Sequence, residues 1–384
     1  MADYSERALL PEGFHDDLPP EAEGEASVIA ALLARFQAYG YGRVAPPLVE
    51  FEDSLLAGSG KTQSRQMFRL MDPVSQRMMG IRTDMTIQVA RIAATRLAAS
   101  PRPLRLCYAG QVLLVKGGQI RSERQFGQAG VELIGVGSIE ADAEVLLLAA
   151  DALRAVGVQG LSADLTVPSL VPVLAAELGL PDVAAGQIRA ALNAKDIGQL
   201  QSIEGRAGEI FRGLLAASGE ADAALRALQE LQLPAQAAAI VAELQGLVTR
   251  VQALSPDLVL TIDPGEFRGF EYKAGIAFTL FAAKGRGELG RGGRYEITRA
   301  DTGAAEAATG VSLYLDSLMR VATAPDMAAK LYVPHGTAVT LLAGLQDQGY
   351  RTVRGLAPEA DVRAAARHLG CGYIYADERI TLLD

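Results

Sequence analysis

The chain has 384 residues, of which 49% are hydrophobic and 21% are charged, a composition typical of a globular protein with more than one domain. Its formal net charge of −9 argues against nonspecific binding of nucleic acid through a basic surface. The two cysteines, Cys107 and Cys371, form no CxxC pair, so we expect neither a disulfide framework nor a zinc site.

Neither a membrane span nor a secretory signal peptide is expected from the sequence. No apolar run reaches membrane-spanning length, and the first residues (MADYSERALLPEG) lack the apolar core of a signal peptide. We therefore expect a cytoplasmic protein that does not associate with membranes.

The first hundred residues mix helical and strand patterns. Apolar residues at helical spacing predict a helix over 21–39, and the prolines of RVAPPL limit residues 43–48 to an edge strand. GSGKT at 58–62 has part of a phosphate-loop pattern, but the required earlier glycine is Leu55, so a nucleotide site is not expected there. A hairpin around Asp72-Pro73 and a helix over 87–98 follow.

Residues 121–135 (RSERQFGQAGVELIG) form the most informative stretch. Its glycines disfavour a helix, so we predict that its second half is a strand pairing antiparallel with an apolar strand over 104–115. Alternate residues of a strand share a face, which puts Gln128, Gly130 and Glu132 together, with Val131 and Leu133 toward the core. Such a face makes either the floor of a pocket for a small cationic ligand or a solvated polar surface. A helix over 139–156 comes next.

The composition changes after residue 167. Residues 168–253 are rich in Ala, Leu and Gln and predict several short helices, inserted between sheet-forming segments. Strands are expected at 258–263 and toward 281, and GRGELG at 285–290 is read as a hairpin rather than a dinucleotide loop. Residues 309–321 predict a buried helix, and residues 331–384 predict a small module of alternating strands and helices.

An ordered series of motifs resembles the histidyl-tRNA synthetase branch of the class II aminoacyl-tRNA synthetase family. In chain order the matching segments are LPPE (18–21), YGY (39–41), PPL (46–48), RTDMT (82–86), RQFGQ (124–128) through Glu132, RGFEY (268–272) and GGRY (292–295). The resemblance implies an α+β fold with an antiparallel sheet flanked by helices. The domains expected are a synthetase-like domain at 1–167 and 256–325, a helical insertion at 168–255, and a shortened C-terminal α/β domain at 326–384.

Two departures from that family concern the arginines that hold ATP beside a carboxylate. Guanidinium groups neutralise phosphate and carboxylate oxygens bidentately. The arginine of the family's Phe-Arg-x-Glu pattern falls at Leu114, and the arginine of Gly-Leu-Glu-Arg falls at Ser317. Losing one preorganised contact of this kind costs about 3–4 kcal/mol in the transition state, so we expect the adenylate chemistry to be lost. Arg320, one helical turn beyond Ser317, offers partial compensation at most.

The resemblance also implies that the amino-acid half of the site is kept. The implied histidine-binding residues are Asp84, Thr86, Gln128, Glu132, Arg268, Tyr272 and Tyr295. Asp84 and Thr86 would receive the α-ammonium with Gln128 beside them, and Glu132 would accept a hydrogen bond from an imidazole N–H. Asp84 or Thr86 could instead be only a helix cap. The family's second tyrosine is Lys273, whose ammonium cannot accept a hydrogen bond from imidazole.

A histidine-binding synthetase fold without the adenylate arginines resembles the regulatory subunits of ATP phosphoribosyltransferase. That resemblance implies a noncatalytic chain with no catalytic residues, cofactor or metal, which activates a short catalytic subunit in the first step of histidine biosynthesis and makes it respond to L-histidine. It implies a self-dimer within a hetero-oligomer and no nucleic-acid partner. The nearest string to a pyrophosphate loop, Asp301-Thr302-Gly303, follows the polar Arg299 rather than a buried strand.

The alternative is a histidyl-tRNA synthetase with a degenerate ATP site. It would need a basic surface for tRNA and a complete anticodon domain, and the acidic, shortened C-terminal part argues against both. An amino-acid-dependent modifier of another protein would also need ATP, and the same missing arginines argue against it.

Overall fold

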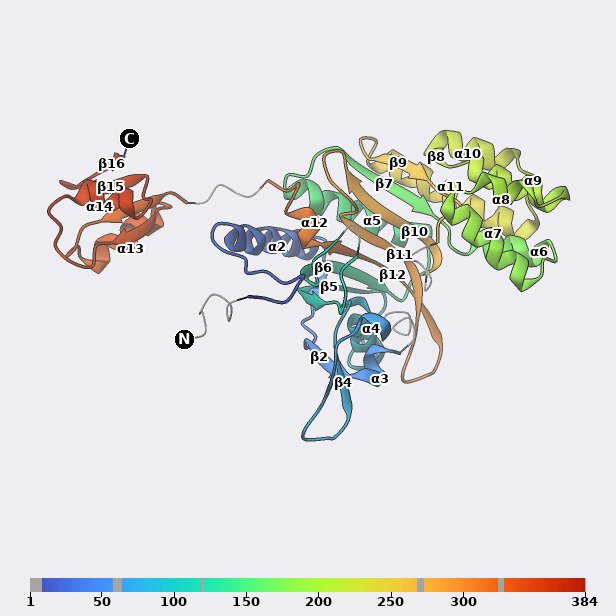
Figure 1. Cartoon of the computed structure of the whole chain (residues 1–384), viewed down its shortest axis with the longest axis horizontal. Coiled ribbons are helices and arrows are strands. Elements are labelled where there is room, and N and C mark those ends of the chain that lie inside the picture. The colour runs from blue at the N-terminus through green and yellow to red at the C-terminus, as the bar shows by residue number, and fades with distance from the viewer. Residues whose placement is uncertain (1–8, 58–63, 119–120, 268–272, 324–327, 384) are drawn as a thin grey trace. The chain divides into compact units, whose positions relative to one another are not determined.

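The computed structural model describes residues 9–57, 64–118, 121–267, 273–323 and 328–383. The chain divides into two compact units, Met1–Ala324 and Pro325–Asp384 (Figure 1). The predicted division of the first unit into a synthetase-like domain and an insertion stays a prediction. The helices of residues 170–254 belong to the same compact unit as the sheet.

The first unit is built on one large sheet. Within the described residues nine strands follow the spatial order β1-β5-β6-β12-β11-β10-β7-β9-β8. Their bounds are β1 Gly42–Arg43, β5 Leu104–Leu113, β6 Gln125–Ile134, β7 Leu161–Thr166, β8 Gly219–Glu220, β9 Val259–Ile262, β10 Lys273–Ala282, β11 Gly290–Thr298 and β12 Ala305–Tyr314. The pairs β1–β5 and β7–β9 are parallel, and the other pairs are antiparallel.

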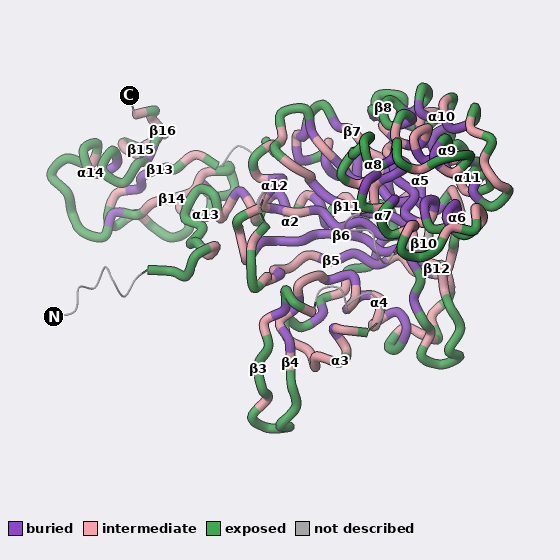
Figure 2. Tube along the Cα trace, turned by 45° about the vertical axis from the view of Figure 1, so that its right-hand side comes forward, coloured by how far each residue is buried: buried purple, intermediate pink, exposed green. Residues whose placement is uncertain are grey.

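Helices cover both faces of this sheet, which is why its central strands carry no solvated side. The helices α2 (Glu21–Ala38) and α5 (Ile139–Ala155) pack on one face, against Val131 and Leu133 among others. The helix α4 (Thr86–Thr95) packs on the other face, in a separate apolar cluster. The tube of β6 is buried along almost its whole length in Figure 2.

Three short strands make a second sheet beside α4, and a short helix follows the first of these strands. They are β2 (Val49–Phe51), α3 (Glu52–Leu55), β3 (Arg69–Met71) and β4 (Met78–Ile81). The antiparallel pair β3–β4 confirms the hairpin predicted around Asp72-Pro73. The GSGKT segment lies outside the described residues.

Six helices follow β7 and gather at one end of the sheet (Figure 1). Their bounds are α6 Leu170–Glu177, α7 Asp182–Ala194, α8 Ile197–Gln201, α9 Gly205–Ala216, α10 Ala221–Glu230 and α11 Ala235–Leu254. Because α11 packs against α5, buried residues of these helices and of the sheet belong to one continuous apolar cluster. None of the helices in the described part of the chain is both long and apolar enough to cross a membrane.

Two sequence predictions were wrong in extent. Residues 309–321 do not form one helix, because Thr309 to Tyr314 complete β12, and only α12 (Leu315–Leu318) is helical. A central strand packed on both faces presents a continuous apolar run, which periodicity does not separate from a buried helix. Of residues 43–48 only Arg43 lies in a strand, β1. The carbonyls of Pro46 and Pro47 accept side-chain hydrogen bonds from Arg82 and Gln88.

The second unit is a small α/β module with its own core. Its elements are β13 Lys330–Val333, α13 Val339–Asp347, β14 Arg351–Arg354, α14 Val362–His368, β15 Tyr373–Ala376 and β16 Arg379–Leu382. The strand order is β14-β13-β15-β16. Leu331 and Tyr332 alternate along β13, so that Leu331 belongs to one apolar cluster and Tyr332 to the other.

Candidate functional site

The polar face of β6 lies against α4, at the centre of the large sheet. Gln128 pairs in register with Tyr314 of β12, and Glu132 pairs with Gly310. A Cβ atom added at Gly310 would lie 1.7 Å from Oε2 of Glu132, so only glycine leaves space for this carboxylate. Gln128 is 1% exposed and Glu132 is 0% exposed, and the alternative of a solvated polar surface is therefore wrong.

Glu132 accepts hydrogen bonds from two buried tyrosines. The hydroxyl of Tyr295 donates to Oε2 at 2.7 Å, and the hydroxyl of Tyr108 donates to Oε1 at 3.2 Å. Burial, and next the charge of Glu132, raises the pKa of Tyr108 well above its usual value. The Tyr108 hydroxyl therefore stays protonated and available as a donor.

Gln128 connects the start of α4 to Ser312 of β12. Its amide nitrogen donates to Oδ2 of Asp84 at 2.8 Å and to Oγ of Ser312 at 2.8 Å. Its amide oxygen accepts from the backbone N–H of Met85 at 2.9 Å, which fixes the orientation of the amide. Oδ1 of Asp84 accepts from the backbone N–H of Thr86 at 2.7 Å. Asp84 is thus a local turn residue as well as a partner of Gln128.

Ser312 and Tyr108 complete the network. Their hydroxyl oxygens lie 3.0 Å apart, and the Thr86 hydroxyl lies 3.3 Å from that of Tyr108. Five of the residues predicted for the site are therefore brought together: Asp84, Thr86, Gln128, Glu132 and Tyr295. Arg268 and Tyr272 lie outside the described residues. Lys273 is paired with Tyr295 in the register of β10 and β11.

Sequence reasoning missed Tyr108 and Ser312. Tyr108 lies opposite Gly130, between the positions that oppose Gln128 and Glu132, so the expected β5–β6 register contained a signal for it. Ser312 lies opposite Gly130 from the other side, on a segment that the sequence analysis assigned to a helix. That wrong assignment hid it.

A hollow of about 450 Å³ borders this network between α4 and β11. Thr86 and Tyr295 belong both to its lining and to the network, and the rest of the lining includes Ala90, Ala94 and Ile297. The hollow offers mostly apolar walls beside the hydroxyl groups of the site. That combination of apolar walls and a few fixed polar groups is typical of a small-molecule site.

The two positions of the missing arginines hold no cation. Leu114 packs against the apolar cluster on the α4 side of the sheet, and Ser317 is buried in α12. The cation beside Ser317 is Arg121, whose Nη2 lies 3.5 Å from the Ser317 hydroxyl. Arg320, which the sequence analysis considered as compensation, forms an ion pair with Glu123 at 2.8 Å.

Arg121 is itself held by the protein. Its Nε lies 2.7 Å from Oδ2 of Asp316, and its guanidinium carbon lies 4.6 Å from the centroid of Phe126 and 4.1 Å from that of Tyr314. Burial raises the pKa of Asp316, while Arg121 opposes that rise. In this pairing the positive charge of Arg121 compensates a buried carboxylate.

The cavity next to α12 is acidic. It has a volume of about 250 Å³ and carboxylates along much of its wall, from Asp17, Glu21, Glu25, Glu123 and Asp316. Burial, followed by the charge of Asp17, raises the pKa of Glu25. These carboxylates repel a triphosphate. Among the described residues no group of three or more His, Cys, Asp or Glu side chains could hold a metal ion.

Comparison with known proteins identifies the family of this chain. The sequence model described as histidyl-tRNA synthetase matches residues 13–318. The ATP phosphoribosyltransferase regulatory subunit of Rhodospirillum centenum is 52% identical, over 97% of this chain and 96% of the relative. The protein of the same name from Gluconobacter oxydans is 43% identical, over 98% of both chains. This chain belongs to the family of ATP phosphoribosyltransferase regulatory subunits.

Solved structures agree with the fold of this regulatory-subunit family. A Bacillus halodurans protein described as an ATP phosphoribosyltransferase regulatory subunit/histidyl-tRNA synthetase superposes with a TM-score of 0.82 at 23% identity, covering 94% of this chain and 96% of the other. Histidyl-tRNA synthetase from Nostoc sp. gives a TM-score of 0.78 at 19% identity, covering 96% and 90%. The predicted α+β fold of the class II synthetase type is thereby confirmed.

Proposed function

We propose that this chain is a noncatalytic regulatory subunit that activates the short catalytic subunit of ATP phosphoribosyltransferase in the cytoplasm. That enzyme carries out the first step of histidine biosynthesis. Family membership carries the proposal, because relatives covering nearly the whole chain bear the regulatory-subunit name. Two observations favour a regulator over a synthetase that uses ATP: Arg121 is paired with Asp316, and the cavity next to α12 is lined by carboxylates.

The effector in this proposal is L-histidine, bound at the buried network of β6. Glu132 accepts the imidazole N–H in exchange for one of its tyrosine hydrogen bonds. Asp84 and Thr86 receive the α-ammonium, with Gln128 beside them, hydrogen-bonded to Asp84. Arg268 and Tyr272 are proposed as further contacts. A buried acceptor of this kind rejects amino acids that lack a ring N–H, because it would otherwise stay unpaired.

Feedback requires that histidine bind the two states of the complex unequally. A coupling free energy of about 1–3 kcal/mol is sufficient, and substrate binding to the catalytic subunit then changes histidine affinity by the same factor. The proposed assembly is a hetero-oligomer in which this chain also pairs with a second copy of itself.

The decisive experiment combines the purified chain with the short catalytic subunit and measures phosphoribosyl-ATP formation with and without histidine. We expect turnover to rise when the chain is added and to fall when histidine is then included. Unchanged turnover in both conditions would refute the regulatory function. Histidine-dependent exchange of pyrophosphate into ATP by this chain alone would show instead that it is a synthetase.

A further inference from the structure

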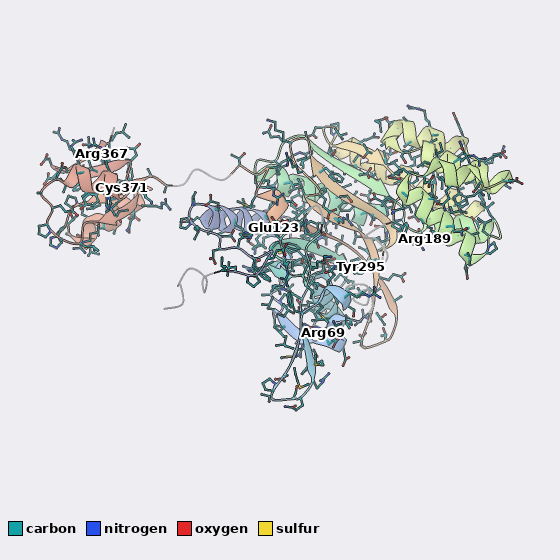
Figure 3. All side chains as sticks on the ribbon, in the orientation of Figure 1. Arg69, Glu123, Arg189, Tyr295, Arg367 and Cys371 are labelled. Carbon is teal, nitrogen blue, oxygen red and sulfur yellow. The ribbon has the colours of Figure 1, made fainter. Side chains whose placement is uncertain are left out.

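The cavity next to α12 is separate from the proposed histidine site, because none of its lining residues belongs to the network around Glu132. Its volume of about 250 Å³ suits a small molecule rather than a folded partner. The wall comes from the leader before α2, from α2 itself, from β5 and β6, and from α12. Glu123, labelled in Figure 3, lines the cavity together with Glu21 and Glu25 of α2.

The wall carries more negative than positive charge. Its carboxylates are those of Asp17, Glu21, Glu25, Glu123 and Asp316, and its basic groups are those of His15 and Arg320. Arg320 is already paired with Glu123 at 2.8 Å. Within the described residues Glu25 has no ion-pair partner, and its carboxylate accepts from the amide of Gln111 at 3.3 Å. A cation that enters the cavity therefore meets an excess of negative charge.

One of these carboxylates has an oxygen that lacks a donor. The side chain of Asp316 is 7% exposed, and its Oδ2 faces Nε of Arg121 at 2.7 Å. Its Oδ1 is buried and has no hydrogen-bond partner in the part of the chain that the structure describes. A buried carboxylate oxygen without a donor is costly. Because Arg121 is not part of the cavity wall and Asp316 is, Oδ1 is the oxygen that remains for a donor in the cavity.

The carboxylates also act on one another. Burial raises the pKa of Glu25, and the charges of Asp17 and Asp316 add to the rise. Burial raises the pKa of Asp316 as well, with a smaller contribution from the charge of Glu123 and against the effect of Arg121. These groups are therefore close enough to repel one another, and a cation between them offsets the repulsion.

The rest of the wall indicates which kind of cation fits. Phe126, Leu315 and Met319 add apolar surface. A Cβ atom added at Gly127 would lie 2.7 Å from Oε1 of Glu25, so glycine leaves space for this carboxylate. No cluster of carboxylates in the described ranges could hold a metal ion. Apolar surface beside carboxylates suits an organic cation, whose carbon chain and N–H donors match the two kinds of wall.

We propose that the cavity next to α12 binds a small organic cation that carries an ammonium or guanidinium group. The N–H groups of this ligand donate to Oδ1 of Asp316 and to the carboxylate of Glu25, and its carbon chain lies against Phe126. Such a site is independent of the proposed histidine site, so histidine binding neither supports nor contradicts it.

The test is calorimetric titration of putrescine and of agmatine into the full chain at constant ionic strength. We expect at least one of these amines to bind saturably, with a Kd of about 1 mM or lower, and the neutral diol analogue of putrescine not to bind. Asp316→Asn and Glu25→Gln should each weaken the binding at least about tenfold, the scale of a hydrogen bond to a charged group. Glu209→Gln, which removes an exposed carboxylate of α9, is the matched control.

Four results would overturn the site. They are the absence of saturable binding by both amines, a diol that binds as tightly as putrescine, affinity within twofold of the natural protein in a folded Asp316→Asn or Glu25→Gln variant, and an equal loss in Glu209→Gln. The last of these would show that net charge alone attracts the amines. Should Asp316→Asn fail to fold because Arg121 loses its carboxylate, the contrast between Glu25→Gln and Glu209→Gln decides.

Discussion

Glu132 is a carboxylate without solvent contact whose two oxygens accept from Tyr108 and Tyr295. Gly310, which lies opposite Glu132 on β12, has no side chain and so leaves space for this carboxylate. The alternation of Gln128, Gly130 and Glu132 in the sequence predicted that these residues share a face. It did not reveal that two tyrosine hydroxyls converge on Glu132, because those donors come from strands 24 and 163 residues away in sequence.

Glu132→Gln tests the acceptor role with little change in volume. An amide accepts through only one oxygen and carries no charge, so we expect histidine affinity to fall at least about tenfold, the scale of a hydrogen bond to a charged group. Calorimetry measures the affinity, and urea unfolding shows whether the fold is kept. Glu209→Gln, at an exposed position of α9, is the control. Equal affinity of Glu132→Gln and the natural protein would remove Glu132 from the site.

At the scale of elements, α5 is tied to the sheet by a buried ion pair. Asp142 on α5 accepts from the Thr309 hydroxyl of β12 at 2.7 Å and from Arg294 of β11. The side chain of Asp142 is 2% exposed. Arg294 belongs to the GGRY motif that carried the family resemblance, and its contacts in this structure are to Asp142 and to Glu243 of α11. We infer that its role here is structural.

Arg294→Ala should lower the free energy of unfolding by about 3 kcal/mol, because it leaves a buried carboxylate unpaired. Arg250→Ala should cost under about 1 kcal/mol, because the ion pair of Arg250 on α11 with Glu140 on α5 is solvent-exposed. Urea unfolding measures both. A cost for Arg294→Ala no larger than that for Arg250→Ala would contradict the assignment.

The pH dependence of this variant follows from Asp142. Burial raises the pKa of Asp142 in the folded protein, although Arg294 opposes the rise. Without Arg294 the folded-state pKa lies still further above the unfolded value, so the folded state takes up the proton more readily. The destabilisation should therefore shrink as the pH falls from neutrality toward that pKa. A loss that grows with acidity would show that Asp142 is not the cause.

The whole molecule consists of two units with separate cores. The unit Met1–Ala324 contains the complete described network around Glu132, and Pro325–Asp384 has its own apolar clusters on either side of β13. The alternation of short apolar strands with helices over residues 331–384 predicted this C-terminal module. The domain boundaries within the first unit stay a prediction, because the apolar core continues from α5 into α11.

Removal of residues 325–384 tests how far the units are independent. We expect residues 1–324 to fold and to bind histidine within about twofold of the full chain, because each core is self-contained. Circular dichroism and calorimetric titration of the shortened chain measure this. A large loss of affinity, with helix and strand content intact, would show that the C-terminal module contributes to the site.

The sequence by itself determined the fold class, the family, and the grouping of Asp84, Gln128 and Glu132. These depend on local spacing and motif order, which are written along the chain. Tertiary structure alone decided that β12 is a central strand bearing Ser312, and that Arg121 lies beside the position of a lost arginine. Only contacts between segments far apart in sequence, such as the pairing of β12 with β6 and the ion pair of Arg121 with Asp316, could decide those points. For residues 121–135 the sequence left two alternatives, the floor of a pocket or a solvated polar surface. The structure shows instead that Gln128 and Glu132 belong to a buried network of hydrogen bonds.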